Sequence, residues 1–156
     1  MAAPQVGAKV KDFTADTTAG EPFRLAGARG KAVVLYFYPK DMTSGCTVQS
    51  QEFRDLAGRF QRSGAIILGV SRDSLKSHAK FREKESLPFD LLSDPEEKLC
   101  RQFDVIREKT LYGRKYMGIE RSTFLIDAQG VLRHEWRKVK VAGHAQEVLD
   151  ALRASI

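Results

Sequence analysis

The segment KAVVLYFYPKDMTSGC, residues 31–46, decides the fold class of this chain. Residues 31–38 form a nearly continuous run of β-branched, aromatic and other apolar residues, which predicts a strand buried on both faces. A second such run, GAIILGVS at residues 64–71, follows a stretch with apolar residues at helical spacing. Two buried strands joined by a helix predict a βαβ unit, and therefore parallel neighbouring strands.

Further elements extend this unit on both sides. DFTAD (12–16) and PFRLA (22–26) predict a short extended pair before it. Strands around the turn DAQG (127–130) and a closing amphipathic helix over 143–155 follow it. We therefore expect an α/β protein with a thioredoxin-like fold: a mixed central β-sheet flanked by helices, with an N-terminal β-hairpin extension. The length predicts a single domain over residues 1–156.

Helix signals divide the middle of the chain. We expect helices over about 44–62 and from about Ser74 to Glu85, with Ser74 as N-cap. A short strand in FDLLSD then leads to another helix. Its expected N-cap is Asp94, with Pro95 at the first helical position and Glu97 completing a capping box.

Composition narrows the class of protein. The 156 residues are 42% hydrophobic and 29% charged, as in ordinary soluble globular proteins. No apolar run approaches the roughly 18 residues of a membrane span, and the N-terminus lacks the apolar core of a secretory signal. Two cysteines form no disulfide framework and are typical of a reducing compartment, so we expect a cytoplasmic protein without a membrane partner.

The formal net charge of +6 raises the question of an anionic partner. Lysines and arginines are dispersed and interleaved with acids, and the densest cluster is RHEWRKVKVAGH at residues 133–144. We interpret this cluster as the solvated face and end of a strand. Basic nucleic-acid binding remains a weaker alternative that salt-sensitive retention on DNA would reveal, and we expect no nucleic-acid partner.

Cys46 is the residue whose position indicates chemistry. Active sites of open α/β sheets lie beyond the carboxyl ends of the strands, and Cys46 lies in the first turn of the helix that follows one. A helix N-terminus favours an anion, here the nucleophilic thiolate. Pro39 would shield the thiol from water, and the Thr43 hydroxyl would point into the same pocket. A buried structural cysteine and a simple Thr43 N-cap are the alternatives.

Two kinds of redox chemistry compete at such a thiol. Dithiol exchange by the usual C-x-x-C motif is excluded, because the sequence reads CTVQ with Gln49 at the fourth position. A single activated thiolate can instead attack a peroxide O–O bond and become a sulfenic acid. That reaction needs donors that hold the peroxide and stabilise the leaving oxygen.

A resemblance to a known family supports the second chemistry. The pattern P-x-x-x-[TS]-x-x-C occurs as Pro39, Thr43 and Cys46. The wider text FYPKDMTSGCTVQSQEFRDL, with GVSRDS, LPFDLLSD and GIERSTFLID, resembles the peroxiredoxins, and among them the Q-type or bacterioferritin-comigratory-protein subgroup. The resemblance covers nearly the whole chain in order.

The resemblance implies a role for each matching residue. Cys46 would be the peroxidatic nucleophile, Thr43 would bind the peroxide through its hydroxyl, and Pro39 would shield the sulfur. Arg121, which alone reads as a surface strand arginine, matches the active-site arginine of the family. Its guanidinium would favour the thiolate and stabilise charge on the peroxide oxygens. Gln49, one turn after Cys46, is placed where it can hydrogen-bond near the site.

The usual second cysteine of this subgroup is absent. Position 51 holds Gln51, and SHAKFREKES at residues 77–86 contains no cysteine. The remaining cysteine, Cys100, lies in a predicted helix beside Leu99 and is expected to be a small buried hydrophobe rather than a resolving residue. We therefore expect a one-cysteine thiol peroxidase for hydrogen peroxide and organic hydroperoxides.

Partners follow from this mechanism. The reductant would be an external thiol, either thioredoxin or glutathione with glutaredoxin, and the subgroup implies a monomer without a cofactor. A redox-sensing thiol protein without efficient turnover is the alternative function. His78, His134 and His144 are scattered, so we expect surface histidines and no metal site.

Overall fold

The structure, a computed structural model, describes residues 3–155 and contains nine strands and four α-helices. The strands are β1 (Thr14–Thr17), β2 (Phe23–Arg24), β3 (Ala32–Phe37), β4 (Ala65–Ser71), β5 (Leu91–Ser93), β6 (Ile106–Leu111), β7 (Arg114–Ile119), β8 (Ser122–Ile126) and β9 (Leu132–Trp136). The helices are α1 (Ser44–Arg62), α2 (Leu75–Lys84), α3 (Lys98–Gln102) and α4 (His144–Ala154), with a short 3-10 helix, η1 (Leu25–Ala28).

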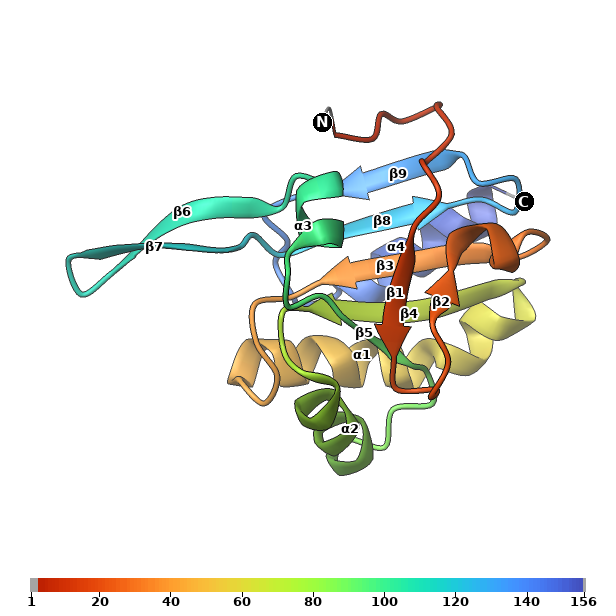
Figure 1. Cartoon of the computed structure of the whole chain (residues 1–156). Helices are drawn as coiled ribbons and strands as arrows, with labels where there is room; N and C mark the ends of the chain where they lie inside the picture. The colour runs from red at the N-terminus through yellow and green to blue at the C-terminus, as the bar shows by residue number, and fades with distance from the viewer. Residues whose placement is uncertain (1–2, 156) are drawn as a thin grey trace.

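Seven of the strands form one sheet in the order β2-β1-β5-β4-β3-β8-β9 (Figure 1). Strand β3, an inner strand of this sheet, is buried along its whole length, as its apolar run predicts. It pairs in parallel with β4 and antiparallel with β8, and β4 pairs in parallel with β5. The mixed sheet and the N-terminal hairpin of β1 and β2 are therefore confirmed.

Each face of the sheet has its own hydrophobic core, because successive side chains of a strand point to opposite faces. Val34 and Tyr36 of β3 belong to the core that α1, α2 and α4 cover. Val33, Leu35 and Phe37 belong to the core that includes the α3 side chains. Figure 1 shows the helices on both sides of the sheet.

The predicted helices are largely confirmed, with one correction at α3. Helix α1 spans the predicted residues, and Ser74 caps α2 by accepting a hydrogen bond from the Ser77 amide at 3.2 Å. Helix α3, however, begins at Lys98, so the expected N-cap at Asp94 and the capping box to Glu97 are wrong. Glu97 instead has a left-handed backbone, with φ of 62°, and ends a turn that precedes the helix.

A two-stranded arm, residues 106–119, projects from the body (Figure 1), and its pairing apart from the main sheet was not expected from the sequence. Strands β6 and β7 pair antiparallel from Ile106↔Ile119 to Leu111↔Arg114. Tyr112 at its tip is 95% exposed. The arm matters for the site because its second strand leads directly to Arg121.

Across residues 3–155, no helix combines the length and the apolar character needed to span a membrane.

Candidate active site

The loop after β3 and the first turn of α1 hold the cysteine singled out by the sequence. Residues 39–43, here called the 39–43 loop, connect the two elements, and Cys46 is the third residue of α1. Only 1% of Cys46 is exposed, and its side chain lies in the core beneath α1, as the inward helical stripe predicts. The thiol is therefore shielded from bulk water, although residues shortly before it in the sequence are exposed.

Arg121 reaches Cys46 although 75 positions separate them. Because β8 runs antiparallel to β3 with Phe37 opposite Ser122, the residue before β8 lies beside the carboxyl end of β3. From there the Arg121 Nη2 donates to the Cys46 Sγ at 3.4 Å. A guanidinium at this distance stabilises negative charge on sulfur.

Two neighbours fix the guanidinium in place. Arg121 Nη1 donates to the Gln49 Oε1 at 2.5 Å, so the planar guanidinium contacts both Gln49 and Cys46. Gly45 leaves room for this plane, since a Cβ atom at position 45 would lie 3.2 Å from Arg121 Nη2. The Gln49 Nε2 is buried and, among the residues that the structure describes, has no hydrogen-bond partner. One amide group is therefore free to donate within the site.

Pro39 and Thr43 are the first and last residues of the 39–43 loop. Thr43 occupies the N-cap position of α1, but its hydroxyl does not cap the helix. It donates to the Lys40 carbonyl at 2.9 Å, which leaves the oxygen lone pairs free to accept a hydrogen bond. Thr43 is exposed and Pro39 is half-buried, so both are nearer the solvent than the buried Cys46.

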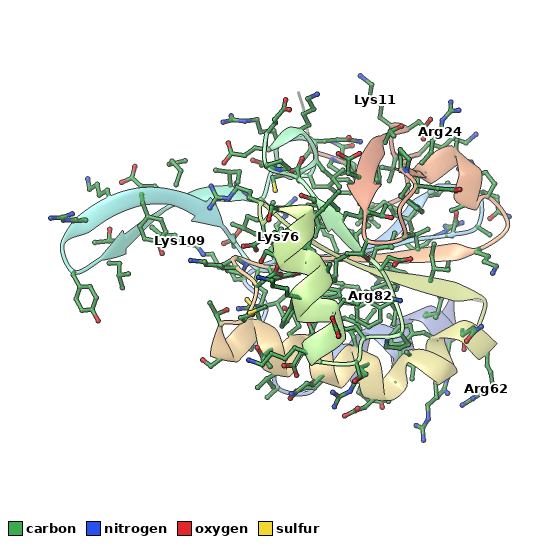
Figure 2. The ribbon with its side chains drawn as sticks, turned by 60° about the horizontal axis from the view of Figure 1, so that its bottom comes forward. Lys11, Arg24, Arg62, Lys76, Arg82 and Lys109 are labelled. Carbon is green, nitrogen blue, oxygen red and sulfur yellow. The ribbon has the colours of Figure 1, made fainter. Side chains whose placement is uncertain are left out.

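Lys109, which the sequence did not single out, is a second cation near this thiol. It extends from the arm (Figure 2), and its Nζ donates to the Ile119 carbonyl, two residues before Arg121. Burial lowers the pKa of Lys109, the positive charge of Arg121 lowers it further, and negative charge on Cys46 opposes both. The signal in the sequence was weak, because lysine is common on exposed strands.

Other cations are spread over the molecule. Figure 2 labels them on separate elements: Lys11 and Arg24 near the N-terminus, Arg62 at the end of α1, and Lys76 and Arg82 on α2, besides Lys109. The positive net charge therefore comes from dispersed residues.

Cys100 lies on the other face of the sheet. It is fully buried in α3 among residues of the second core, whereas Cys46 belongs to the first, and both are free thiols. Burial above all, and then the negative charge of Asp94, raise the pKa of Cys100 far above the usual range. The expectation of a buried, inert cysteine agrees with this environment.

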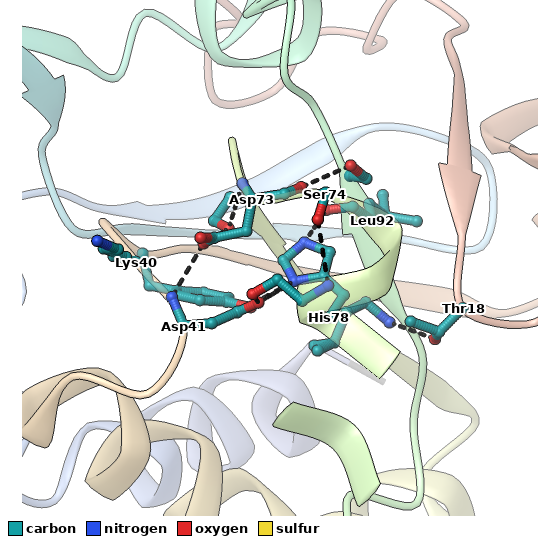
Figure 3. Close-up of polar contacts among 12 residues, drawn as sticks. Thr18, Lys40, Asp41, Asp73, Ser74, His78 and Leu92 are labelled. Carbon is teal, nitrogen blue, oxygen red and sulfur yellow. Dashed lines mark hydrogen bonds and ion pairs between the residues drawn. The ribbon is translucent and has the colours of Figure 1, made fainter. Parts of the chain in front are cut away.

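The expectation of surface histidines is correct for His134 and wrong for the other two. His144 is buried and makes a hydrogen bond of 2.8 Å with the Thr123 hydroxyl. His78 is fully buried beneath the 39–43 loop, where it pairs with Asp41 (Figure 3). The signal that could have found it is the spacing of His78 and Phe81, which share the inward face of α2.

Comparisons with known proteins agree with this site. Residues 6–135 match the AhpC/TSA family. Peroxiredoxin Bcp of Bacillus subtilis is 51% identical, over 96% of this chain and 95% of its own length. The bacterioferritin comigratory protein of Xanthomonas campestris, studied for its alkyl peroxide reduction activity, is 48% identical with a TM-score of 0.90 over 99% of each chain. A mutant of Xylella fastidiosa PrxQ is 41% identical with a TM-score of 0.93, also over 99% of each.

These matches span the whole site, from the 39–43 loop to Arg121. The chain belongs to the AhpC/TSA family, and within it to the Q-type peroxiredoxins. Its activity is that of a thiol peroxidase, which acts on a peroxide and depends on a thiol reductant. The comparisons thus favour the enzyme over the redox-sensing alternative.

Proposed function

We propose that Cys46 is the peroxidatic residue of a one-cysteine cycle whose second thiol comes from another molecule. The observation that carries the proposal is the contact of 3.4 Å between Arg121 and the Cys46 sulfur at the start of α1. The separation of Cys100 from this sulfur by the full sheet supports the external thiol.

In the first step the Cys46 thiolate attacks the nearer peroxide oxygen. A sulfur–oxygen bond forms, the O–O bond breaks, and the departing oxygen takes a proton and leaves as water or an alcohol. Arg121 stabilises the negative charge that moves from sulfur to that oxygen. The Thr43 oxygen accepts a hydrogen bond from the peroxide O–H, the Gln49 amide donates to an oxygen of the substrate, and Pro39 limits access of water.

In the second step an external thiol attacks the sulfenic acid, which releases water and leaves a mixed disulfide. A second thiol then attacks this disulfide, so that Cys46 returns as a thiol and the reductant leaves oxidised. We propose thioredoxin or glutaredoxin with glutathione as the source, a choice that turnover with each reductant at equal thiol concentration decides.

Hydrogen peroxide and organic hydroperoxides are the proposed substrates. The activity studied in the Xanthomonas campestris relative supports the organic ones. The exposed apolar side chains of Met42 and Val48, 45% and 46% exposed, flank Cys46 in sequence and offer contact to an alkyl group. We further propose a monomer in the cytoplasm, for which sedimentation and cell fractionation are the tests.

The experiment is intact mass after one equivalent of hydrogen peroxide. The proposal expects one added oxygen atom on Cys46, no added oxygen in Cys46→Ser, and full peroxide turnover in the matched Cys100→Ser variant. Loss of two hydrogen atoms with a Cys46–Cys100 link would contradict the one-cysteine cycle. Turnover that survives Cys46→Ser would overturn the site itself.

A further inference from the structure

Asp41 differs from every neighbour in the 39–43 loop. Lys40 is exposed, as are residues 42–44, and Pro39 is half-buried. Asp41 is 5% exposed, so a charged residue is the buried one in an otherwise solvated segment. A carboxylate is buried only where it is paired and hydrogen-bonded, and its partners therefore define what the loop is attached to.

The partners of Asp41 come chiefly from α2 (Figure 3). The Nδ1 of His78 lies 2.8 Å from Asp41 Oδ2 and 3.0 Å from Oδ1. The Ser77 hydroxyl donates to Oδ2 at 2.8 Å, and the Tyr38 hydroxyl donates to Oδ1 at 2.6 Å. Burial works against the charge, yet the hydrogen bonds from these groups, His78 first, hold the pKa of Asp41 below its usual value.

Both ring nitrogens of His78 face hydrogen-bond acceptors. Its Nε2 lies 2.9 Å from the Leu92 carbonyl of β5, and its Nδ1 lies 2.8 Å from the Asp41 carboxylate. The fully buried His78 ring therefore bridges the 39–43 loop and β5.

A main-chain contact holds the same point of the loop. The Asp41 amide donates to the Asp73 Oδ2 at 2.9 Å, and Asp73 is itself held by the Ser71 hydroxyl at 2.5 Å. The next residue, Met42, has a left-handed backbone with φ of 64°, which a non-glycine residue adopts when the surrounding structure imposes it. The loop is thus fixed in one conformation immediately before Thr43.

We propose that Asp41 and His78 are positioning residues of the peroxidase reaction: the pair attaches the 39–43 loop to α2 and thereby holds Thr43 and the start of α1 closed over Cys46. The inference rests on the proposed role of Cys46. The closed loop places the peroxide-binding groups, and the same loop has to open before the buried sulfur can meet the thiol of a second protein.

The test measures these two demands separately in a Cys100→Ser background, where Cys46 is the one thiol. His78→Leu removes the polar ring, whereas His78→Asn keeps a side-chain amide donor. Asp41→Asn keeps the size of the side chain and serves if His78→Leu does not fold. The readouts are the second-order rate constant with hydrogen peroxide and the rate of Cys46 alkylation by a bulky maleimide.

We expect the two rates to move in opposite directions. In His78→Leu the peroxide rate constant falls about tenfold, because the reacting groups lose their alignment. Alkylation rises about tenfold, because the open loop is more populated. His78→Asn and Asp41→Asn show smaller changes of the same sign. A merely structural histidine would lower stability without this divergence.

Asp94→Asn is the matched control, since it also replaces a buried carboxylate at the carboxyl end of a sheet strand. Its carboxylate binds the amides of Leu99 and Cys100 and not the 39–43 loop. Rates in His78→Leu and Asp41→Asn equal to those of this control overturn the proposal. Peroxide turnover that survives Cys46→Ser would instead refute the proposed function, so the two failures are distinguishable.

Discussion

Cys46 and Cys100 are each the third residue of a helix, each buried and each free, yet they differ in the charged side chain that acts most strongly on the thiol. Arg121 donates a hydrogen bond to the Cys46 sulfur, whereas the carboxylate of Asp94 acts more strongly on Cys100 than Arg72 does. The two cysteines therefore have the same position in a helix, and the charged side chain beside each thiol distinguishes them.

The helix N-termini differ as well. At α3 the Asp94 oxygens accept from the amides of Leu99 and Cys100, at 3.1 and 2.7 Å, and so use the donors that would stabilise a thiolate. At α1 the Thr43 hydroxyl bonds Lys40 instead of the helix, so its side chain leaves the first amides free. A helix N-terminus activates a thiol only where no carboxylate occupies it.

Removing the cation gives the largest effect on this comparison. In Arg121→Met, we expect the rate constant with peroxide to fall about 100-fold, the usual cost of one transition-state donor. Stopped-flow oxidation of the protein measures it. The control Arg114→Met removes an exposed arginine of the arm and should keep the parental rate. A loss in both variants would point to a general effect of charge.

Removing the carboxylate at Cys100 gives the next effect. Asp94→Ala leaves two buried amides without their acceptor, and we expect about 2 kcal/mol of lost stability in urea unfolding. The pKa of Cys100 should fall, because a negative charge beside the thiol is gone. Asp55→Ala, at a side chain that is 65% exposed, should change neither quantity. Unchanged stability in Asp94→Ala would show that the hydrogen bonds from the Leu99 and Cys100 amides to this carboxylate do not stabilise the fold.

A smaller effect is expected from Lys109. In Lys109→Met one positive charge near Cys46 disappears, and we expect the peroxide rate constant to fall about threefold, as for a screened charge near a surface. Lys115→Met is matched in chemistry and strand pairing, but Lys115 is 76% exposed. Equal rates in the two variants would show that Lys109 acts only through net charge.

The smallest expected effect is a change in how the free energy of unfolding depends on pH. The folded pKa of Asp41 lies below its usual value, so the carboxylate stabilises the fold above about pH 4 and this contribution is lost as pH falls through the folded value. Urea unfolding between pH 3 and about pH 6 should show a shallower dependence in Asp41→Asn, whose position 41 no longer titrates. An identical pH dependence in the parent and the variant would mean that other carboxylates account for the loss of stability in acid.

Much of the fold was predictable because the buried strands carry a strong pattern. The apolar runs at 31–38 and 64–71 indicate β3 and β4, and helix α1 follows from its inward stripe. The arm was not predictable in this way. Residues of β6 and β7 are mostly solvated on both faces, so neither strand has the alternation of a half-buried one.

The site was predictable in part for a similar reason. The position of Cys46 after a buried strand indicates a reactive site. Arg121 lies 75 positions away and reaches Cys46 through the antiparallel pairing of β3 and β8, so only the family resemblance indicated its role. The spacing of His78 and Phe81 indicates the burial of His78, but its contact with Asp41 and the place of Lys109 near Cys46 depend on tertiary packing. Asp94 does hold α3, but through amides five and six residues away rather than as an N-cap.

The position of the sheet between Cys46 and Cys100 also bears on inactivation of the enzyme by overoxidation. A sulfenic acid that meets no thiol can react with a second peroxide and become a sulfinic acid, which ordinary thiols do not reverse. In the proposed one-cysteine cycle, Cys100 lies behind the sheet and does not intercept that reaction. We therefore expect the working lifetime of Cys46 to depend on the ratio of external thiol to peroxide, so that excess peroxide inactivates the enzyme.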